Sequence, residues 1–192
     1  MIVCFFGIYD TNYPRTRVIA KGLEKNGVKV ILCRIDSSLS GSFRLRDLPL
    51  LFYYYLKLLF RYINALRRSS FDIILLGYPG WHVMPIAKLI SLVTRRPLVF
   101  DAHYSIYDTD VVDRRFVKAN SLYARLLFLI DKISCNLADI VLLDTYVHIA
   151  YFSRAFDIRK EKFRRILVGS DDDVFYPRSH AKRAEDFLVA FW

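Results

Sequence analysis

The polar residues best placed for chemistry follow directly after an apolar run of the sequence. The run at 97–100 is followed by DAHYSIYDT at 101–109, a segment dense in polar and aromatic groups. His103 is the candidate catalytic residue, because an imidazole hydrogen-bonds in either protonation state near neutral pH. A structural loop histidine is the alternative. Three further members of the segment are candidates for binding a substrate: Tyr104, Ser105 and Asp108.

A second polar loop, at 8–17, follows the first apolar run of the chain. Arg15 lies near the expected start of a helix, where backbone N–H groups already favour an anion, and its guanidinium is suited to a two-point grip on a phosphate. A solvated or structural arginine is the alternative. Tyr9 and Asp10 are candidates for binding substrate, although an Asp in a turn is as often a local cap. The loop lacks GxGxxG, so an ordinary dinucleotide site is weakly supported.

Two groups of carboxylates have spacings that invite a metal interpretation. Asp108, Asp110 and Asp113 are better explained as turn and helix-start residues with a local ion pair, and residues 171–173 as turn residues of a linker. We therefore predict no metal. Of the other histidines, His82 is expected at a helix terminus, whereas His148 and His180 are expected on the surface.

The three cysteines fit no metal or disulfide pattern. Their number is odd, no CxxC spacing occurs, and Cys4 and Cys33 fall inside strand-like runs. Small buried thiols in a reducing cytosol explain them. The N-terminus has neither a basic segment nor a cleavage site, so it does not resemble a secretion signal. These features favour a cytoplasmic protein.

The elements that must position these side chains follow from the hydrophobic pattern. Short apolar runs that do not alternate are typical of parallel strands buried on both faces, and here they are separated by helix-length segments. We therefore predict an α/β fold with a Rossmann-like, doubly wound parallel sheet, whose ligands bind at the carboxyl ends of the strands. The six predicted strands are residues 2–6, 28–33, 73–76, 97–100, 140–143 and 165–168.

Two predicted helices carry unusual apolar surfaces. In the segment 48–68 a polar stripe runs through an otherwise apolar helix, with further basic residues at its flanks. Contact with an anionic membrane is one explanation, and burial against a partner domain or in a dimer is the other. In the helix predicted at about 118–137, apolar residues at helical spacing are expected to contact the core. The predicted membrane contacts are Lys57, Arg61, Arg67 and Arg68, and the predicted core contacts are Leu122, Leu126, Leu129, Ile130 and Ile133.

Four segments together resemble glycosyltransferase family 4, which has the GT-B fold of two facing Rossmann-like domains. LADIVLLDT at 137–145 resembles the family's helix-to-strand element, with Asp and Thr where Ser is usual. The pattern G-x-D-x3-F-x-P at 169–177 resembles the junction that leads into the donor domain. YPR at 13–15 and the segment 101–109 complete the set. The first loop lacks the Gly-Gly pair of many members, so the family's diphosphate contacts do not carry over to it.

The resemblance implies what the chain does. It implies an N-terminal, acceptor-side domain at 1–177, followed at 178–192 by a linker and the first strand of a missing donor-binding domain. The parent would transfer a sugar from a nucleotide-sugar donor to a carbohydrate or lipid-linked acceptor, with retention, without a metal and with no cofactor. Family members often place a histidine facing the acceptor, at the position of His103. The isolated domain is expected to be inactive. The segment 48–68, and not the resemblance, adds the expectation of a cytoplasmic chain that lies peripherally at the inner face of the membrane.

The charge of the chain supports a different class of function. A formal net charge of +10 fits a non-catalytic module that binds an anionic surface or nucleic acid. No helix-turn-helix, RNP or zinc-finger pattern occurs, and the basic residues are scattered, so we expect no nucleic-acid partner. A complete single-domain protein, whose last strand joins its own sheet, is the third alternative.

Overall fold

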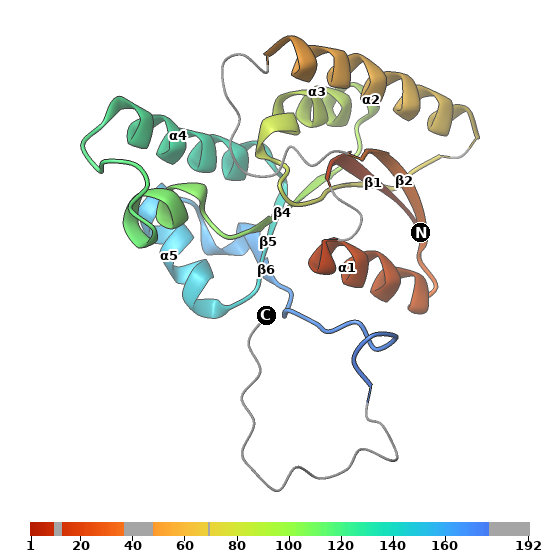
Figure 1. The fold of residues 1–192 in the computed structure, drawn as a ribbon. Helices are drawn as coiled ribbons and strands as arrows, with labels where there is room; N and C mark the ends of the chain where they lie inside the picture. Colours follow the sequence, from red (N-terminus) through yellow and green to blue (C-terminus); the bar gives the residue numbers. More distant parts are fainter. Residues whose placement is uncertain (10–12, 37–47, 69, 177–192) are drawn as a thin grey trace, which may run out of the picture.

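A computed structural model describes residues 1–9, 13–36, 48–68 and 70–176 (Figure 1). Its centre is a six-stranded sheet with the order β2-β1-β3-β4-β5-β6, and every neighbouring pair is parallel. The prediction of a doubly wound, Rossmann-like α/β fold is therefore confirmed. The strands are β1 (Ile2–Ile8), β2 (Lys29–Ile35), β3 (Ile73–Leu76), β4 (Leu98–His103), β5 (Ile140–Leu143) and β6 (Phe163–Arg165).

The strands form where the sequence is apolar without alternation, because both faces of the sheet are covered. Five of the predicted runs coincide with or overlap β1 to β5. The sixth prediction, 165–168, is displaced: β6 ends at Arg165, and Leu167 and Val168 are exposed. Ile166 donates its N–H to the Leu143 carbonyl, but the chain then leaves the sheet edge.

Helices pack on both faces of the sheet (Figure 1). On one face α1 (Pro14–Lys25) packs over β1 and β2, and on the other lie α2 (Leu48–Arg68), α3 (Met84–Thr94) and α4 (Leu122–Leu137). The last helix, α5 (Tyr146–Phe156), contacts β5 and β6. Because the strands are parallel, the loops at their carboxyl ends lie at the same edge of the sheet.

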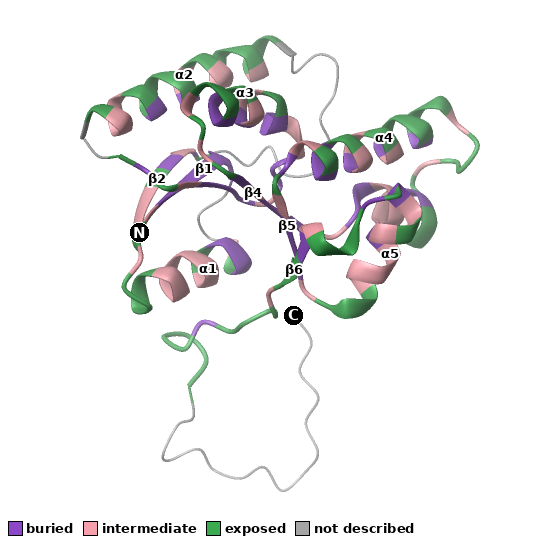
Figure 2. Cartoon of the chain, turned by 180° about the vertical axis from the view of Figure 1, so that it is seen from behind, coloured by how far each residue is buried: buried purple, intermediate pink, exposed green. Residues whose placement is uncertain are grey.

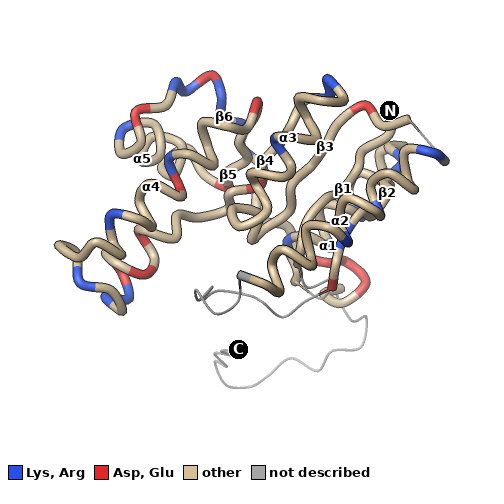
Figure 3. Tube along the Cα trace, turned by 90° about the horizontal axis from the view of Figure 1, so that it is seen from above, with Lys and Arg blue, Asp and Glu red and all other residues tan. Residues whose placement is uncertain are grey.

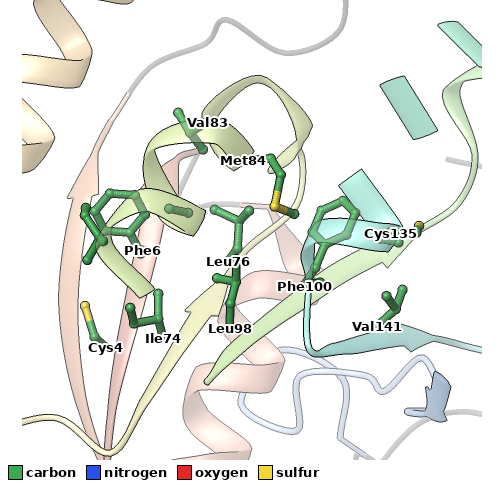
Figure 4. Packing of buried hydrophobic residues seen from close by; sticks show 14 of the residues in the cluster. Cys4, Phe6, Ile74, Leu76, Val83, Met84, Leu98, Phe100, Cys135 and Val141 are labelled. Atoms are coloured by element: carbon green, nitrogen blue, oxygen red, sulfur yellow. The ribbon is translucent and has the colours of Figure 1, made fainter. Parts of the chain in front are cut away.

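The main core lies between the sheet and the layer of α2, α3 and α4 (Figure 4). Phe6, Leu76 and Phe100 project from three neighbouring strands toward Met84 at the start of α3. Burying each such side chain contributes about 1.5–3 kcal/mol to folding. This core fixes the strand ends relative to one another.

The start of α4 differs from the prediction. Ser121 caps the helix by accepting a hydrogen bond from the Ala124 N–H, so the helix begins at Leu122 rather than near residue 118. A serine at this position satisfies a backbone donor that would otherwise have no partner.

The predicted core face of α4 is also wrong. Leu122, Leu126, Leu129 and Ile133 are exposed, whereas the buried side includes Ala124, Leu127 and Cys135. Ile130, the remaining residue of that prediction, is partly buried. Helical spacing alone identifies the stripe of larger apolar side chains on α4. A second stripe, which contains smaller side chains, faces the sheet instead. Figure 2 shows exposed residues along the outer sides of α2 and α4.

After β6 the chain is held against α1 by ion pairs. Asp171 Oδ2 lies 2.7 Å from Arg17 Nε, and Asp171 Oδ1 lies 2.8 Å from Lys21 Nζ. Lys25 Nζ lies 2.5 Å from Asp172 Oδ2. These cations lower the pKa of both carboxyl groups. The predicted turn at 171–173 is thus tied to the first helix.

No helix in the described part of the chain has the length and hydropathy required to cross a bilayer. The predicted linker and strand at 178–192 lie outside the described residues, as does Asp10.

Candidate active site

The candidate site lies where β1, β3, β4 and β5 end at the same edge of the sheet. Because all four strands are parallel, the residues that follow them are neighbours although they are far apart in the sequence. The strand-end segments contribute Tyr78, His103 and Asp144, and Tyr13 comes from the start of α1.

Arg15 and Asp101 form a buried ion pair beneath this edge. The Arg15 Nε atom lies 2.9 Å from both carboxylate oxygens, and Nη2 lies 2.7 Å from Oδ1. Only 6% of Arg15 and none of Asp101 is exposed. Burial raises the pKa of Asp101, and the Arg15 guanidinium opposes that rise. Two of the guanidinium nitrogens, Nε and Nη2, are therefore engaged by Asp101, and Nη1 is buried with no partner among the described residues. The tie to Asp101 favours the structural alternative over the predicted grip on a phosphate.

Above the ion pair, His103 lies among three tyrosine rings, and we name Tyr13, Tyr78, His103 and Tyr104 the aromatic cluster. The centroid of the His103 ring lies 5.0 Å from that of Tyr104, 5.6 Å from that of Tyr78 and 6.4 Å from that of Tyr13. The hydroxyls of Tyr78 and Tyr104 share a hydrogen bond. All four side chains are half-buried, so each packs on its neighbours and still reaches the surface.

The electrostatics of the cluster keep His103 neutral. Burial, with a smaller contribution from the Arg15 charge, lowers the pKa of His103 from 6.5 to about 4. The backbone of His103 has φ 59°, in the left-handed region, and its buried Nδ1 has no hydrogen-bond partner among the residues that the structure describes. A neutral imidazole with so low a pKa is a weak base near pH 7. Its geometry fits hydrogen bonding to a substrate hydroxyl better than proton abstraction.

A second polar pair, Asp144 and His148, lies at the side of the site where β5 ends. His148 Nδ1 lies 2.5 Å from Asp144 Oδ1, and the Thr145 hydroxyl caps α5 by accepting from the His148 N–H. The charge of Asp144 raises the pKa of His103, and the charge of His148 lowers it. With Nδ1 held by the carboxylate, the remaining nitrogen, Nε2, is left for a ligand. His148, predicted on the surface, is half-buried and borders the site.

Ser105 and Asp108, both predicted to bind substrate, have structural partners. The Ser105 hydroxyl is buried, donates to Asp131 Oδ2 at 2.6 Å and accepts from the Asp108 N–H at 2.9 Å. Burial raises the pKa of Asp131 to about 6. Ser105 therefore organises the loop after β4, and only the half-buried carboxylate of Asp108 reaches the surface.

Tyr9 lies in the core rather than at the site. Its side chain is 1% exposed, and its ring packs edge-on against Phe5 at a centroid distance of 5.4 Å. The guanidinium of Arg34 lies over the same ring. This burial argues against the predicted contact with substrate.

The predicted membrane contacts lie on α2, away from the site. Lys57 is half-buried with its ammonium over the Tyr53 ring, and Arg61 donates to the Arg34 carbonyl oxygen. Arg67 is exposed, and the side chain of Arg68 lies outside the described residues.

Comparisons with known proteins support the fold. No family model matches the sequence, and no curated protein matches it. Among solved structures, the chain resembles the crystal structure of the glycotransferase of kitacinnamycin, with a TM-score of 0.52 and 10% identity over 96% of this chain. The fold is shared with a glycosyltransferase. The likeness covers 54% of that chain, so the 192-residue chain spans about half of its neighbour's length.

Sequence reasoning did not select Tyr13, Tyr78 or Asp144 as site residues, and for Tyr78 the sequence contains a signal that could have identified it. Gly77 and Gly80 flank Tyr78-Pro79 directly after β3, and the Tyr78–Pro79 peptide is cis. A Cβ on Gly77 would lie 2.5 Å from the Phe5 ring, and one on Gly80 would lie 2.6 Å from Leu76. Two glycines around a proline after a buried strand indicate a tight loop at the ligand-binding edge.

Proposed function

We propose that this chain is the acceptor-side domain of a glycosyltransferase that moves a sugar from a nucleotide-sugar donor to a carbohydrate or lipid-linked acceptor. The observation that carries the proposal is the aromatic cluster at the carboxyl edge of a fold shared with a glycosyltransferase. Ligands of parallel α/β sheets bind at this edge. The sequence resemblance to family 4 gives the proposal its direction.

The chemistry of the cluster suits a sugar. Tyrosine rings offer apolar faces and a hydroxyl at the rim, so they pack against a sugar ring and hydrogen-bond its hydroxyls. Tyr78 and Tyr104 already share a hydrogen bond, and a bound hydroxyl would extend that network. The neutral His103 would orient the hydroxyl that attacks, and His148, held by Asp144, would contact the acceptor from the side.

The donor would be held by a second domain. The chain spans about half of the glycotransferase that it resembles, and its Arg15 is engaged by Asp101. The charge that develops on the departing diphosphate would therefore be stabilised by groups of the other domain. The resemblance to family 4 leads us to propose transfer with retention and without a metal, and no turnover by the 192-residue chain alone.

Acceptor binding tests the site. Saturation-transfer NMR with a panel of methyl hexosides and short oligosaccharides should detect binding to the chain, with tyrosine ring protons as the source. His103→Ala and Tyr78→Ala should abolish the signal. Tyr176→Ala is the matched control, because this tyrosine is exposed and lies outside the cluster. A signal that survives in both cluster variants would place sugar binding elsewhere.

Transfer tests the reaction. The chain alone should release no nucleotide from UDP- or GDP-hexoses, and transfer by the chain alone would refute the division into two domains. In a protein that carries both domains, His103→Ala should lower kcat/KM for the acceptor by about 10²-fold or more, because an oriented hydroxyl is lost. An unchanged value would remove His103 from the site.

A further inference from the structure

The helices α2, α3 and α4 lie on the side of the sheet opposite α1 (Figures 1 and 2). Each of them exposes apolar side chains, and we name these outer faces the apolar layer. On α2 the exposed side chains include Phe52, Leu56 and Phe60, which follow one another at intervals of four residues. They lie on the side of the helix opposite Leu58 and Tyr62, which are buried against the sheet. The helix is thus apolar on both its inner and outer sides.

The same character continues over the next two helices. On α3 the side chains of Leu89, Leu92 and Val93 are exposed, with Val93 at 76%. On α4 the outward stripe includes Leu122 and Leu126, with Leu122 at 83%. Exposed apolar side chains therefore occur on all three helices, and large exposed apolar surfaces mark contacts with a protein or a membrane.

The exposed charges on the three helices themselves are of one sign, although the exposed Asp139, which follows α4, pairs with Lys88 of α3. Among the residues of α2, α3 and α4 the sole acidic one is Asp131, which is buried against Ser105. The helices carry basic residues, among them the exposed Arg61, Arg67 and Arg125 (Figure 3). Apolar side chains bordered by cations, with no exposed carboxylate on the helices themselves, match the interface of an anionic lipid bilayer.

We propose that the outer faces of α2, α3 and α4 dock on an anionic membrane surface, with the apolar side chains inserted between the headgroups. The predicted contacts Lys57, Arg61 and Arg67 border this surface instead of forming it. A second copy of the chain fits less well, because it would bring the same cations against these. Nucleic acid fits less well, because phosphates gain nothing from leucine and phenylalanine. The proposal does not depend on the transfer reaction.

Vesicle flotation with the full chain tests the proposal. The protein should float with vesicles of phosphatidylcholine and phosphatidylglycerol in equal amounts at low salt, and less with phosphatidylcholine alone. Phe60→Ser and Leu126→Ser should each weaken binding by about tenfold, because an inserted apolar side chain is lost. Arg125→Gln should weaken binding about fivefold, and on anionic vesicles only.

Matched controls come from exposed residues outside the layer. Leu167→Ser removes an exposed leucine after β6, and Arg159→Gln removes an exposed arginine after α5. Both should float like the unchanged protein, and circular dichroism should show the same fold in all variants. Absence of flotation on anionic vesicles at low salt would overturn the proposal, as would binding that Phe60→Ser and Leu126→Ser leave intact. A dimer in sedimentation velocity that Phe60→Ser dissociates would identify the layer as a protein interface instead.

Discussion

Arg15 at the start of α1 and Asp101 within β4 are joined by a two-point ion pair that is almost wholly buried. The pair ties a helix on one face of the sheet to the strand that carries His103. It also gives Arg15 a structural partner at the place where the sequence indicated a ligand.

Breaking this pair should strongly destabilise the fold. Arg15→Met leaves the Asp101 carboxylate buried without a partner, and we expect a loss of about 3–5 kcal/mol in the free energy of unfolding. The double variant with Asp101→Leu should lose less than the sum of the single changes, since no charge is left unpaired. Urea denaturation measures both. Lys25→Met removes an exposed ion pair and should change little. An equal loss in the free energy of unfolding for Arg15→Met and Lys25→Met would contradict the structural role of the buried pair.

Asp131 should make stability fall as pH rises. Its pKa is raised from 3.8 to about 6, so the folded chain binds more protons than the unfolded chain between these values. The contribution is most favourable below about pH 4 and declines through about pH 6, by at most about 3 kcal/mol. Asp131→Asn keeps an oxygen acceptor for Ser105 and Tyr107 but does not titrate. The difference in the free energy of unfolding between the unchanged protein and Asp131→Asn should therefore change with pH only in this window. A difference that does not vary with pH would exclude the raised pKa of Asp131.

His103 should titrate in the opposite sense. Its pKa of about 4 lies below the ordinary 6.5, so its contribution is fully present above about pH 6.5 and is lost as pH falls through about 4. Ring resonances in a two-dimensional NMR titration should show His103 neutral at pH 5.5, and sugar binding should be constant between pH 5.5 and 8 as far as His103 determines it. A midpoint near 6.5 would show that the ring is not buried in the cluster.

The glycines around Tyr78 should not tolerate a side chain. Gly77→Ala and Gly80→Ala place a methyl group against Phe5 and Leu76 respectively, and such overpacking costs about 1–3 kcal/mol. Gly22→Ala is the matched control, because an added Cβ would meet no atom of the described residues within 4 Å and the residue lies inside α1. That change should stabilise the protein by about 0.5–1 kcal/mol. Thermal unfolding followed by circular dichroism should show a lower Tm for Gly77→Ala and Gly80→Ala and a higher Tm for Gly22→Ala.

The fold was predictable because its signals are local. An uninterrupted apolar run such as that at β3 requires burial on both faces, and this establishes the parallel sheet without knowledge of any contact. The position of His103 followed, because it comes directly after such a run. The end of β6 was not predictable in this way, since Leu167 and Val168 are as apolar as a strand yet lie exposed.

The contacts between distant segments were not predictable. Arg15 and Asp101 are 86 residues apart, and nothing in either loop indicates that one neutralises the other. The pair of Ser105 and Asp131 and the approach of Tyr78 to His103 depend equally on the packing of separate elements. On α4 the sequence contains two stripes, and only the space above the sheet decides that the smaller one faces inward.

The side chains of the aromatic cluster are uncharged near neutral pH, and this has a consequence for binding experiments in solution. A sugar there meets hydroxyls, ring faces and an uncharged imidazole above an internally compensated ion pair, so ionic strength should hardly affect its binding. The layer on α2, α3 and α4 combines cations with apolar side chains, and its attraction to anionic lipid should weaken as salt is added. A simple salt series therefore separates the two surfaces of this protein without any mutation.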